Sequence, residues 1–386
     1  MKTRTKVVNR EIVMFALPWT RETVPHAVIE LTRDCNLSCR ACYREKTPGV
    51  RSIDEILDDV RIIERHQRVH TISLAGGEPT LHPHLPEIVR RVKARGHRVS
   101  LVTNALLLTD DRLSALKAAG LDIVMIHVDE GQDRPDLSDP DDQAAINRLR
   151  ETIAARVAAH GIAAGLCTTL YPETLPHLPA LINLILRSSH INFLFATHAV
   201  TIPALVAECS HAAHVREKTR CETTNSMVMR SMRHQFDLTP YAYIAPSRAN
   251  TDGELPCITY SVPVAHREKP EILRMQSGRA DRRLVMLSRL LAGRYLYFTP
   301  NSLLASCIQI SLNGLFSKKP LRAATFLLRA CGYPLRIKRL VFENAPRLTA
   351  DGTVNCCDFC PNATVREGRM IPVCLADFQQ ELNLNT

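Results

Sequence analysis

The sequence contains few aromatic residues and no long uninterrupted apolar run. Phe, Trp and Tyr together make up 5% of the 386 residues, and tryptophan occurs once. A membrane-spanning helix needs about 20 consecutive apolar residues, so the lack of such a run argues against one. Nucleic acid is not expected as a partner, because few aromatic residues accompany the basic ones and no nucleic-acid-binding motif is present.

A secretory signal and a disulfide framework are also not expected. Residues 1–24, an N-terminal extension, begin with basic residues but lack a sustained apolar stretch and a cleavage site of small residues. The sequence therefore predicts a cytoplasmic location, where thiols stay reduced. Thirteen cysteines are a high number for that compartment, and their clustering indicates metal or cofactor ligation.

Short apolar runs alternate with amphipathic ones through residues 25–200, which is typical of repeated strand and helix units. Parallel strands covered by helices predict an α/β fold, a partial (β/α)6 barrel of the TIM type, with a doubly wound sheet as the alternative. In both arrangements the functional loops follow the carboxyl ends of the strands. The six expected strands are residues 27–31, 70–75, 97–103, 122–128, 162–170 and 191–196.

Three cysteines, Cys35, Cys39 and Cys42, follow the first expected strand and define a cysteine loop. Three thiolates on one short loop can ligate three irons of a cubane cluster and leave the fourth iron open to a substrate or cofactor. A zinc knuckle that takes His26 or His66 as its fourth ligand is the alternative.

A glycine-rich loop of Gly76, Gly77, Glu78 and Pro79 follows the second expected strand. The two glycines allow close backbone approach, the glutamate offers an acceptor for an ammonium group, and the proline fixes the exit of the turn. Because the carboxyl ends of neighbouring parallel strands lie at the same edge, we expect this loop beside the cysteine loop.

Together the two motifs resemble those of the radical S-adenosylmethionine (SAM) superfamily, in which C-x3-C-x2-C follows the first strand and G-G-E-P the second. The resemblance covers roughly residues 25–200. It implies that the three cysteines bind a four-iron four-sulfur cluster whose open iron chelates SAM, and that the loop from Gly76 to Pro79 holds the methionine amine. It also implies that an electron from a reductant such as flavodoxin or ferredoxin cleaves SAM to a 5′-deoxyadenosyl radical, which abstracts hydrogen from the substrate.

Three further residues are predicted to contact SAM. Tyr43 follows the last cysteine of the loop, close to the position just before that cysteine where relatives often carry an aromatic residue. Asn104 ends the third expected strand and is followed by Ala105, where many relatives have glycine. Asp129, with Glu130, ends the fourth expected strand and could bind ribose hydroxyls or a substrate amine, or cap the next turn.

A second cysteine group lies in residues 351–386, the C-terminal cysteine-rich region. Its four members are Cys356, Cys357, Cys360 and Cys374. Cys360 is followed by proline, as at ferredoxin-type clusters, so a second, auxiliary four-iron four-sulfur cluster is one interpretation. A structural zinc site and buried unligated thiols are the alternatives, and Cys257, Cys307 or Cys331 could replace one of the four cysteines.

The basic charge is concentrated in residues 265–350, a segment predicted to be mainly helical, which follows an irregular connecting region at 201–264. Between residues 265 and 340 there are fifteen Lys and Arg and three acidic residues. Helices that join basic charge to aliphatic clusters are typical of contact with an anionic membrane surface, and lipid-linked or phosphorylated substrates would use the same arrangement. A helical cap whose apolar faces pack on the barrel is the alternative.

From these features we predict a radical SAM enzyme, an oxidoreductase or transferase, in peripheral contact with the membrane. Its reaction would be carbon–carbon bond formation or methylation on a lipid or other anionic metabolite. One alternative is a peptide-modifying maturase, since such enzymes commonly use C-terminal clusters. The other is a non-catalytic iron–sulfur protein for electron transfer or binding, although a pure electron carrier needs no methionine pocket.

Overall fold

The computed structural model describes most of the chain. The described residues are 14–40, 42, 46–199, 223–245, 254–274, 278–295, 302–317, 320–348, 354–355, 360–373 and 376. Within them, no helix has both the length and the apolar sequence that crossing a bilayer requires.

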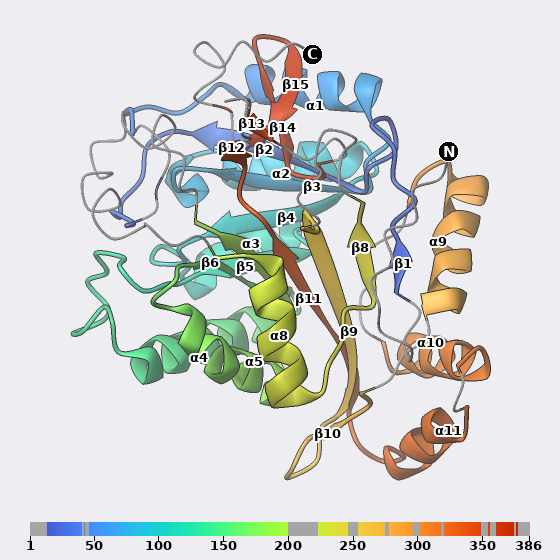
Figure 1. The fold of residues 1–386 in the computed structure, drawn as a ribbon. Coiled ribbons are helices and arrows are strands. Elements are labelled where there is room, and N and C mark those ends of the chain that lie inside the picture. The colour runs from blue at the N-terminus through green and yellow to red at the C-terminus, as the bar shows by residue number, and fades with distance from the viewer. Residues whose placement is uncertain are drawn as a thin grey trace.

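The first half of the chain forms six parallel strands, and helices cover their outer face (Figure 1). The strands follow one another in chain order, which confirms the predicted α/β core with a large parallel sheet. They are β2 (His26–Thr32), β3 (Thr71–Gly76), β4 (Arg98–Thr103), β5 (Ile123–His127), β6 (Ala163–Leu170) and β7 (Ile191–His198). The helices between them are α1 (Ile53–His66), α2 (Leu85–Ala94), α3 (Asp110–Ala119), α4 (Gln143–Ala159) and α5 (Leu178–Arg187).

Local sequence signals explain where these helices begin and end. The Ser52 hydroxyl accepts a hydrogen bond from the Glu55 backbone N–H, and the Glu55 carboxylate accepts one from the Ser52 N–H, so α1 begins with a capping box. Helix α3 ends at Gly120, whose φ of 98° suits glycine. After each helix the chain returns to the sheet in the same direction, and neighbouring strands from β2 to β7 pair in parallel. The carboxyl ends of all six strands therefore meet at one edge.

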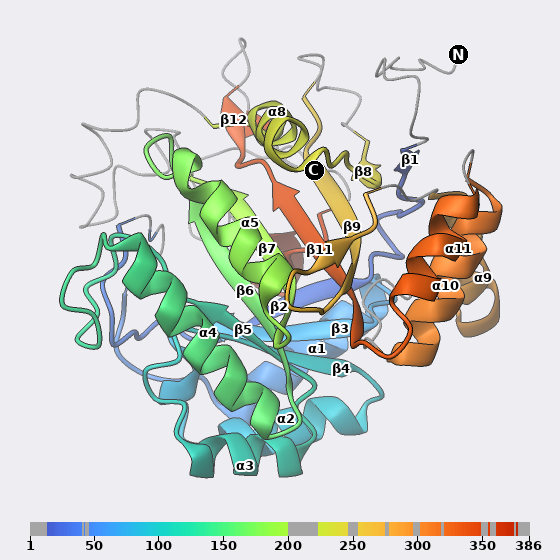
Figure 2. The ribbon, with the colours of Figure 1, turned by 90° about the horizontal axis from the view of Figure 1, so that it is seen from below.

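Two long strands from the second half of the chain extend the sheet beyond β7. Strand β11 (Leu335–Glu343) pairs in parallel with β7, and β9 (Cys257–Ala265) pairs antiparallel with β11. The short strands β8 (Ala242–Ile244), β1 (Phe15–Ala16) and β10 (Glu271–Ile272) complete this side of the sheet. The interior of the partial barrel is therefore built by both halves of the chain (Figure 2).

The connecting region differs from its predicted irregular structure, because it contributes α8 (Asn225–Phe236), β8 and most of β9. Its prolines suggested breaks, yet Pro263 lies inside β9. The Pro263 carbonyl accepts a 2.9 Å hydrogen bond from the Leu273 N–H, on the β10 side. Since the N and O atoms of a strand residue point to the same side, the missing N–H of Pro263 faces away from β11. The proline therefore removes no hydrogen bond from the β9–β11 ladder.

The basic segment also differs from its prediction. It contains α9 (Gly278–Ala292), α10 (Leu303–Leu315) and α11 (Pro320–Arg329), but it ends in β11. In the sequence, the alternation of apolar and polar residues that would predict this strand is interrupted by basic residues, Arg336, Lys338 and Arg339. Lys338 is fully buried, and its Nζ donates to the backbone carbonyls of Ser188 and Ile191, at 2.7 and 2.5 Å. The charge is thus satisfied inside the protein by the end of α5 and the start of β7.

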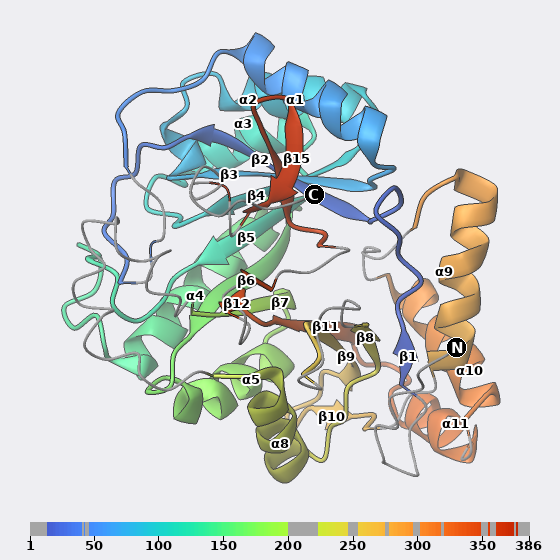
Figure 3. The same cartoon turned by 45° about the horizontal axis from the view of Figure 1, so that its top comes forward.

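The described part of the C-terminal region is a β-hairpin and not a helix. Strands β14 (Ala363–Arg366) and β15 (Arg369–Pro372) pair with each other and lie beside β2 (Figure 3). Arg366 forms an ion pair with Glu30 of β2. A second short pair, β12 (Arg347–Leu348) and β13 (Val354–Asn355), precedes this hairpin.

Candidate functional site

A cavity of about 470 Å³ occupies the interior of the partial barrel. Inward-facing residues of the strands and the loops at their carboxyl ends line it. Several of these lining residues were predicted from the sequence: Cys35, Cys39, Cys42, Gly76, Gly77, Glu78, Asn104, Asp129 and Cys360. Pro79 does not line the cavity but begins a short 3-10 helix, Pro79–Leu81, behind the glycine-rich loop.

The loop that follows β5 holds the middle of the cysteine loop. Cys39 and Gln132 form an isolated β-bridge, and the Arg40 N–H donates to the Gly131 carbonyl at 2.9 Å. The Gln132 side chain lies close enough to donate to Cys39 Sγ, with 3.6 Å between nitrogen and sulfur. Gln132 was not predicted from the sequence; the one signal that points to it is its position three residues after Asp129, in the loop after the same strand.

The electrostatics of Cys39 and Cys35 fit a cluster that brings positive charge. Burial, and after it the neighbouring Cys42 and Cys35, raise the pKa of Cys39 to about 12. Burial also raises the pKa of Cys35. Thiols in such surroundings become thiolates when a bound metal compensates their charge. The donor set therefore suits the iron–sulfur cluster that the resemblance implies.

The zinc alternative gains no support from the geometry. A zinc ion needs its ligands to converge on one point, and the two histidines that the sequence offered as a fourth ligand are not placed to do so. Both ring nitrogens of His26 already have partners, Asn362 and Ser73. His66 is exposed in the last turn of α1. A cubane cluster places its cysteine sulfurs on separate irons and does not require such convergence.

The glycine-rich loop packs directly on the backbone of the cysteine loop. The Gly77 N–H donates to the Thr32 carbonyl, and the Glu78 N–H donates to the Asp34 carbonyl, both at 2.8 Å. A Cβ atom at Gly76 would lie 2.2 Å from the Thr32 oxygen, and one at Gly77 would lie 2.0 Å from the Asp34 oxygen. Both glycines are therefore required by close approach between the two loops.

The Glu78 carboxylate is held by donors of the chain itself. Its buried carboxylate accepts hydrogen bonds from the Thr80 N–H and hydroxyl, from the Thr103 hydroxyl and from the Asn104 N–H, at 2.5 to 2.9 Å. These four donors use the acceptor capacity of a carboxylate. Glu78 thus holds the ends of β3 and β4 together, which favours a positioning role over direct capture of an ammonium group.

Asn104 joins the end of β4 to the cysteine loop. Its Nδ2 donates to Asn36 Oδ1 at 2.8 Å, and its carbonyl accepts from Arg134 Nη1 at 2.9 Å. The next residue, Ala105, has a φ of 66°. This left-handed conformation suits glycine better than alanine, which accounts physically for the glycine of many relatives at this position.

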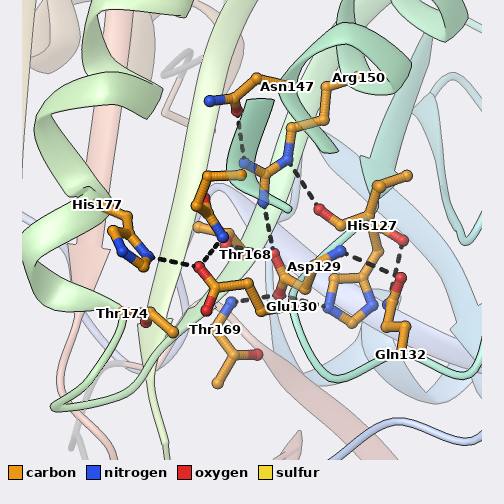
Figure 4. Close-up of polar contacts among 12 residues, drawn as sticks. His127, Asp129, Glu130, Gln132, Asn147, Arg150, Thr168, Thr169, Thr174 and His177 are labelled. Atoms are coloured by element: carbon orange, nitrogen blue, oxygen red, sulfur yellow. Dashed lines mark hydrogen bonds and ion pairs between the residues drawn. The ribbon is translucent and has the colours of Figure 1, made fainter. Parts of the chain in front are cut away.

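Asp129 lies at the centre of a buried polar network (Figure 4). Its Oδ1 accepts from Arg150 Nη2 at 2.8 Å and from the Thr168 hydroxyl, and its Oδ2 accepts from the Thr169 N–H at 2.7 Å and from His127 at 3.1 Å. Burial alone would raise the pKa of Asp129, but His127, Arg150 and Thr168 together hold it below the ordinary value. The chain's own donors occupy this carboxylate, which favours a positioning role. A contact of Asp129 with ribose hydroxyls or with a substrate amine stays a prediction.

Arg150 completes this network from helix α4 and was not foreseen. Besides Asp129, its guanidinium donates to the Val128 carbonyl at 2.8 Å and to Asn147 Oδ1 at 2.9 Å. The middle of α4 is thereby fixed to the carboxyl end of β5 (Figure 4). A sequence does not distinguish an arginine on the buried face of a helix from one that covers its edge.

The C-terminal cysteines are only partly within the described residues. Cys356, Cys357 and Cys374 lie outside them, as does Tyr43. Cys360 lines the cavity, and so does Cys257 of β9. Burial, followed by the nearby Glu343 and Cys360, raises the pKa of Cys257. The structure thus brings Cys257 and Cys360 to the same wall of the cavity, and the auxiliary cluster stays a prediction.

Replacing Gly77 by alanine is expected to destabilise the contact between the two loops. The added Cβ would overlap the Asp34 carbonyl, and overpacking of this kind costs about 1–3 kcal/mol. We expect a lower free energy of unfolding in urea and less iron bound per chain after anaerobic reconstitution. Gly332→Ala is the control for iron binding: its φ of 84° makes alanine unfavourable and should also lower the stability, but nothing lies within 4 Å of the added Cβ, so the iron bound per chain should stay unchanged. Iron binding and stability equal to those of the unsubstituted protein would contradict this role of Gly77.

Comparison with known proteins shows a similarity between the core of the chain and one family. Residues 29–185 match the family model of the radical SAM superfamily. A tungsten-containing aldehyde ferredoxin oxidoreductase cofactor-modifying protein of Pyrococcus furiosus is 38% identical over 108 residues, which are 26% of this chain and 30% of that protein. A GTP 3′,8-cyclase of Chlorobaculum tepidum is 38% identical over 111 residues, 28% of this chain and 33% of that protein. The matches thus span about a third of the length of these relatives.

A solved structure shows a weaker likeness. The crystal structure of Streptococcus suis SuiB bound to S-adenosylmethionine has 13% sequence identity and a TM-score of 0.40, and the match covers 58% of this chain and 52% of that one. At this TM-score the likeness carries no argument, so the assignment rests on the family match and on the motifs. Residues 29–185 are thus similar to the radical SAM superfamily of enzymes, whose cofactors are a four-iron four-sulfur cluster and S-adenosylmethionine.

Proposed function

We propose that the chain acts on a carbon–hydrogen bond of a substrate held in the barrel cavity, leading to carbon–carbon bond formation or methylation. The observation that carries the proposal is that the cysteine loop, the glycine-rich loop and the inward faces of the strands line one cavity. When bound, the cluster and SAM supply a 5′-deoxyadenosyl radical that takes a hydrogen atom from the substrate. A reductant such as flavodoxin or ferredoxin would deliver the electron.

The residues of the chain would bind, orient and exclude water. Cys35, Cys39 and Cys42 would hold the cluster, and Gln132 would orient Cys39 through its hydrogen bond to Sγ. The backbone of Gly76 and Gly77 and the side chain of Asn104 would shape the SAM site. Because these groups lie inside the barrel, the reactive carbon would be kept away from solvent, which limits side reactions.

A lipid substrate is supported by an exposed surface on α9, α10 and α11, which we call the leucine face. The three helices lie side by side on one flank of the molecule (Figure 2). Twelve of the fifteen exposed large apolar residues in the described ranges belong to it: Leu284, Met286, Leu287, Leu290, Leu291, Leu303, Leu304, Ile308, Leu315, Phe316, Leu321 and Leu328. Exposed arginines accompany them: Arg279, Arg282, Arg283, Arg289, Arg322 and Arg329.

The leucine face combines exposed apolar side chains with positive charge, the two features that favour binding to an anionic bilayer surface. Leu290 and Leu291 are 79% and 77% exposed, so most of their apolar surface faces solvent. Burying apolar surface of this kind at the membrane interface stabilises binding, and arginines add attraction to anionic headgroups. The alternative, a helical cap whose apolar faces pack on the barrel, does not explain why these leucines are exposed.

The double substitution Leu290→Ser and Leu291→Ser is expected to weaken binding to vesicles of phosphatidylglycerol and phosphatidylcholine. A buried leucine contributes about 1.5–3 kcal/mol, so partial burial of two supports a decrease in affinity of roughly 10- to 100-fold. Vesicle sedimentation measures the affinity. The control is the double substitution Val50→Ser and Met227→Ser, which removes exposed apolar residues outside the leucine face. Equal losses in both double variants would contradict a specific membrane face.

The proposed reaction is tested on the anaerobically reconstituted chain with dithionite and SAM. Chromatography would measure 5′-deoxyadenosine, and mass spectrometry would search lipid extracts for a modified product. We expect deoxyadenosine together with a lipid product, and about eight irons per chain if the auxiliary cluster is present. Deoxyadenosine formation that depends on peptides and never yields a modified lipid would favour a peptide-modifying maturase instead.

A further inference from the structure

Glu343, the last residue of β11, has one carboxylate oxygen without a hydrogen-bond partner. The residue lines the cavity, is 7% exposed, and is flanked in the sheet by Thr197 of β7 and Cys257 of β9. Its Oε2 accepts a 2.6 Å hydrogen bond from Asn362 Nδ2. Its Oε1 is buried and has no such partner in the part of the chain that the structure describes. A buried polar atom of this kind is costly unless a ligand or water satisfies it.

A chain of hydrogen bonds across the barrel fixes which oxygen of Glu343 is held. Since Asn362 donates through Nδ2, its Oδ1 must accept from His26 Nδ1, 3.0 Å away. His26 Nε2 then accepts from the Ser73 hydroxyl, 2.7 Å away. Burial lowers the pKa of His26 to about 4, which agrees with the neutral ring that this pattern requires. Ser73, His26 and Asn362 thus orient Glu343 and leave Oε1 for another donor.

The charges around Glu343 favour a cation as that donor. Cys257, Cys360 and Glu254 line the same cavity, and none of these side chains can carry positive charge. On its own strand the nearest cavity-lining cation, Arg339, lies four residues earlier, about 13 Å along the strand. A ligand with an ammonium group would supply the missing charge, whereas a carboxylate or phosphate would be repelled.

We propose that the substrate carries a primary amine and that Glu343 Oε1 is its acceptor in the cavity. The inference deepens the proposed function and rests on it only in taking the cavity as the substrate site. It distinguishes the charge of the outer surface from the charge of the cavity, which the basic sequence composition by itself does not do. The arginines of α9 and α11 face the outside, where anionic headgroups would lie, and the acceptor at the carboxyl end of β11 is acidic. An amphiphile with an apolar body and an amine near the reacting carbon fits both the outer surface and the acidic acceptor in the cavity.

Binding of three small probes to the reconstituted full chain tests this inference. The probes n-hexylamine, n-hexanol and hexanoate share one apolar chain and differ in the terminal group, and isothermal titration calorimetry measures their affinities. A hydrogen bond to a charged group contributes about 1.5–3 kcal/mol, so we expect hexylamine to bind at least roughly 10-fold more tightly than hexanol. In Glu343→Gln, which keeps the acceptor for Asn362 but loses the charge, this preference should disappear.

Two further variants separate charge from structure. Glu343→Asp retains the charge and should keep part of the preference for hexylamine, which a purely structural role would not predict. Glu254→Gln removes another cavity-lining acid, whose carboxylate accepts from the Ser226 N–H, and should keep the preference. Hexanol or hexanoate binding as tightly as hexylamine, an unchanged preference in Glu343→Gln, or no measurable binding of hexylamine would each overturn the inference.

The outcome is distinguishable from failure of the proposed function. Probe binding needs neither reductant nor SAM turnover, so a Glu343-dependent preference for the amine would stand even if no lipid supported deoxyadenosine formation. Conversely, turnover of an amine-free lipid at equal rates by the unsubstituted protein and by Glu343→Gln would uphold the radical reaction and overturn the amine site.

Discussion

Replacement of Cys39 by serine is expected to abolish 5′-deoxyadenosine formation and to remove the iron bound by the cysteine loop. Cys39 is the most constrained of the three thiols, because the β-bridge to Gln132 fixes its backbone and the Gln132 amide contacts its sulfur. A serine hydroxyl stays protonated near neutral pH and is a poor ligand for iron compared with a thiolate. Iron analysis, absorption near the cluster bands and chromatography of the products would measure the loss.

The matched control for this loss is Cys331→Ser. Cys331 was named above as a possible replacement ligand, but it is exposed just beyond α11 and does not line the cavity that Cys257 and Cys360 share, so it is not placed to join them. It should keep the iron content and the deoxyadenosine yield of the unsubstituted protein. If Cys39→Ser retained both as well, the cysteine loop would not be the site of the cluster, and the proposed function would fall with it.

Replacement of Arg150 by methionine is expected to lower the free energy of unfolding by about 3–5 kcal/mol, the cost of leaving a buried charge unpaired. The guanidinium is 4% exposed and contacts the Asp129 carboxylate, the Val128 carbonyl and Asn147. Methionine fills a similar volume but donates no hydrogen bond, so the effect would come from lost polar contacts and not from a cavity. Urea unfolding followed by circular dichroism would measure it.

The pH dependence of the stability lost in Arg150→Met tests whether the loss comes from the pairing of Arg150 with Asp129. In the unsubstituted protein the pKa of Asp129 is held below its ordinary value. The ionised carboxylate therefore stabilises the fold at pH values above the ordinary pKa, and this stabilisation is lost only as the pH falls towards the lowered pKa. Without Arg150 the folded-state pKa should rise, and protonation should relieve the buried charge as the pH falls from 7 towards 5. The difference in stability between the two proteins should therefore shrink at lower pH.

The control here is Arg148→Met, two residues away on α4. The Arg148 side chain is 71% exposed and lies 3.7 Å from Asp142. A surface ion pair of this kind contributes little, so we expect a change within about 0.5 kcal/mol. A cost for Arg150→Met that is equally small, or that does not vary with pH, would show that Asp129 is not stabilised by this pairing.

The two halves of the chain contribute different parts of the site. The parallel strands β2 to β7 present the cysteine loop, the glycine-rich loop and Asn104 at one edge. The second half adds β9 and β11, which bring Cys257 and Glu343 to the cavity, and the turn before β14, which brings Asn362. The cofactor side of the site thus lies within the residues that match the family model, and the opposite wall, on which the proposed choice of substrate depends, lies outside them.

Sequence alone predicted the six parallel strands and the two motif loops because both depend on local signals. Alternating apolar patterns report burial within a single strand or helix, and caps such as Ser52 with Glu55 act over three residues. The cysteine loop and the glycine-rich loop could be placed side by side because parallel strands bring their carboxyl ends together. Each of these inferences needs only the order of elements along the chain.

What the tertiary structure decided are the contacts between residues far apart in the sequence. Pro263 is compatible with β9 only because of the side its backbone faces, and the roles of Glu78 and Asp129 depend on donors that arrive from other strands and helices. Glu343 and His26 lie 317 positions apart, yet both contact Asn362. Hydrogen bonding acts over a few ångströms in space and not along the chain, so a sequence can name a carboxylate without revealing whether its oxygens are already occupied or still open to a ligand.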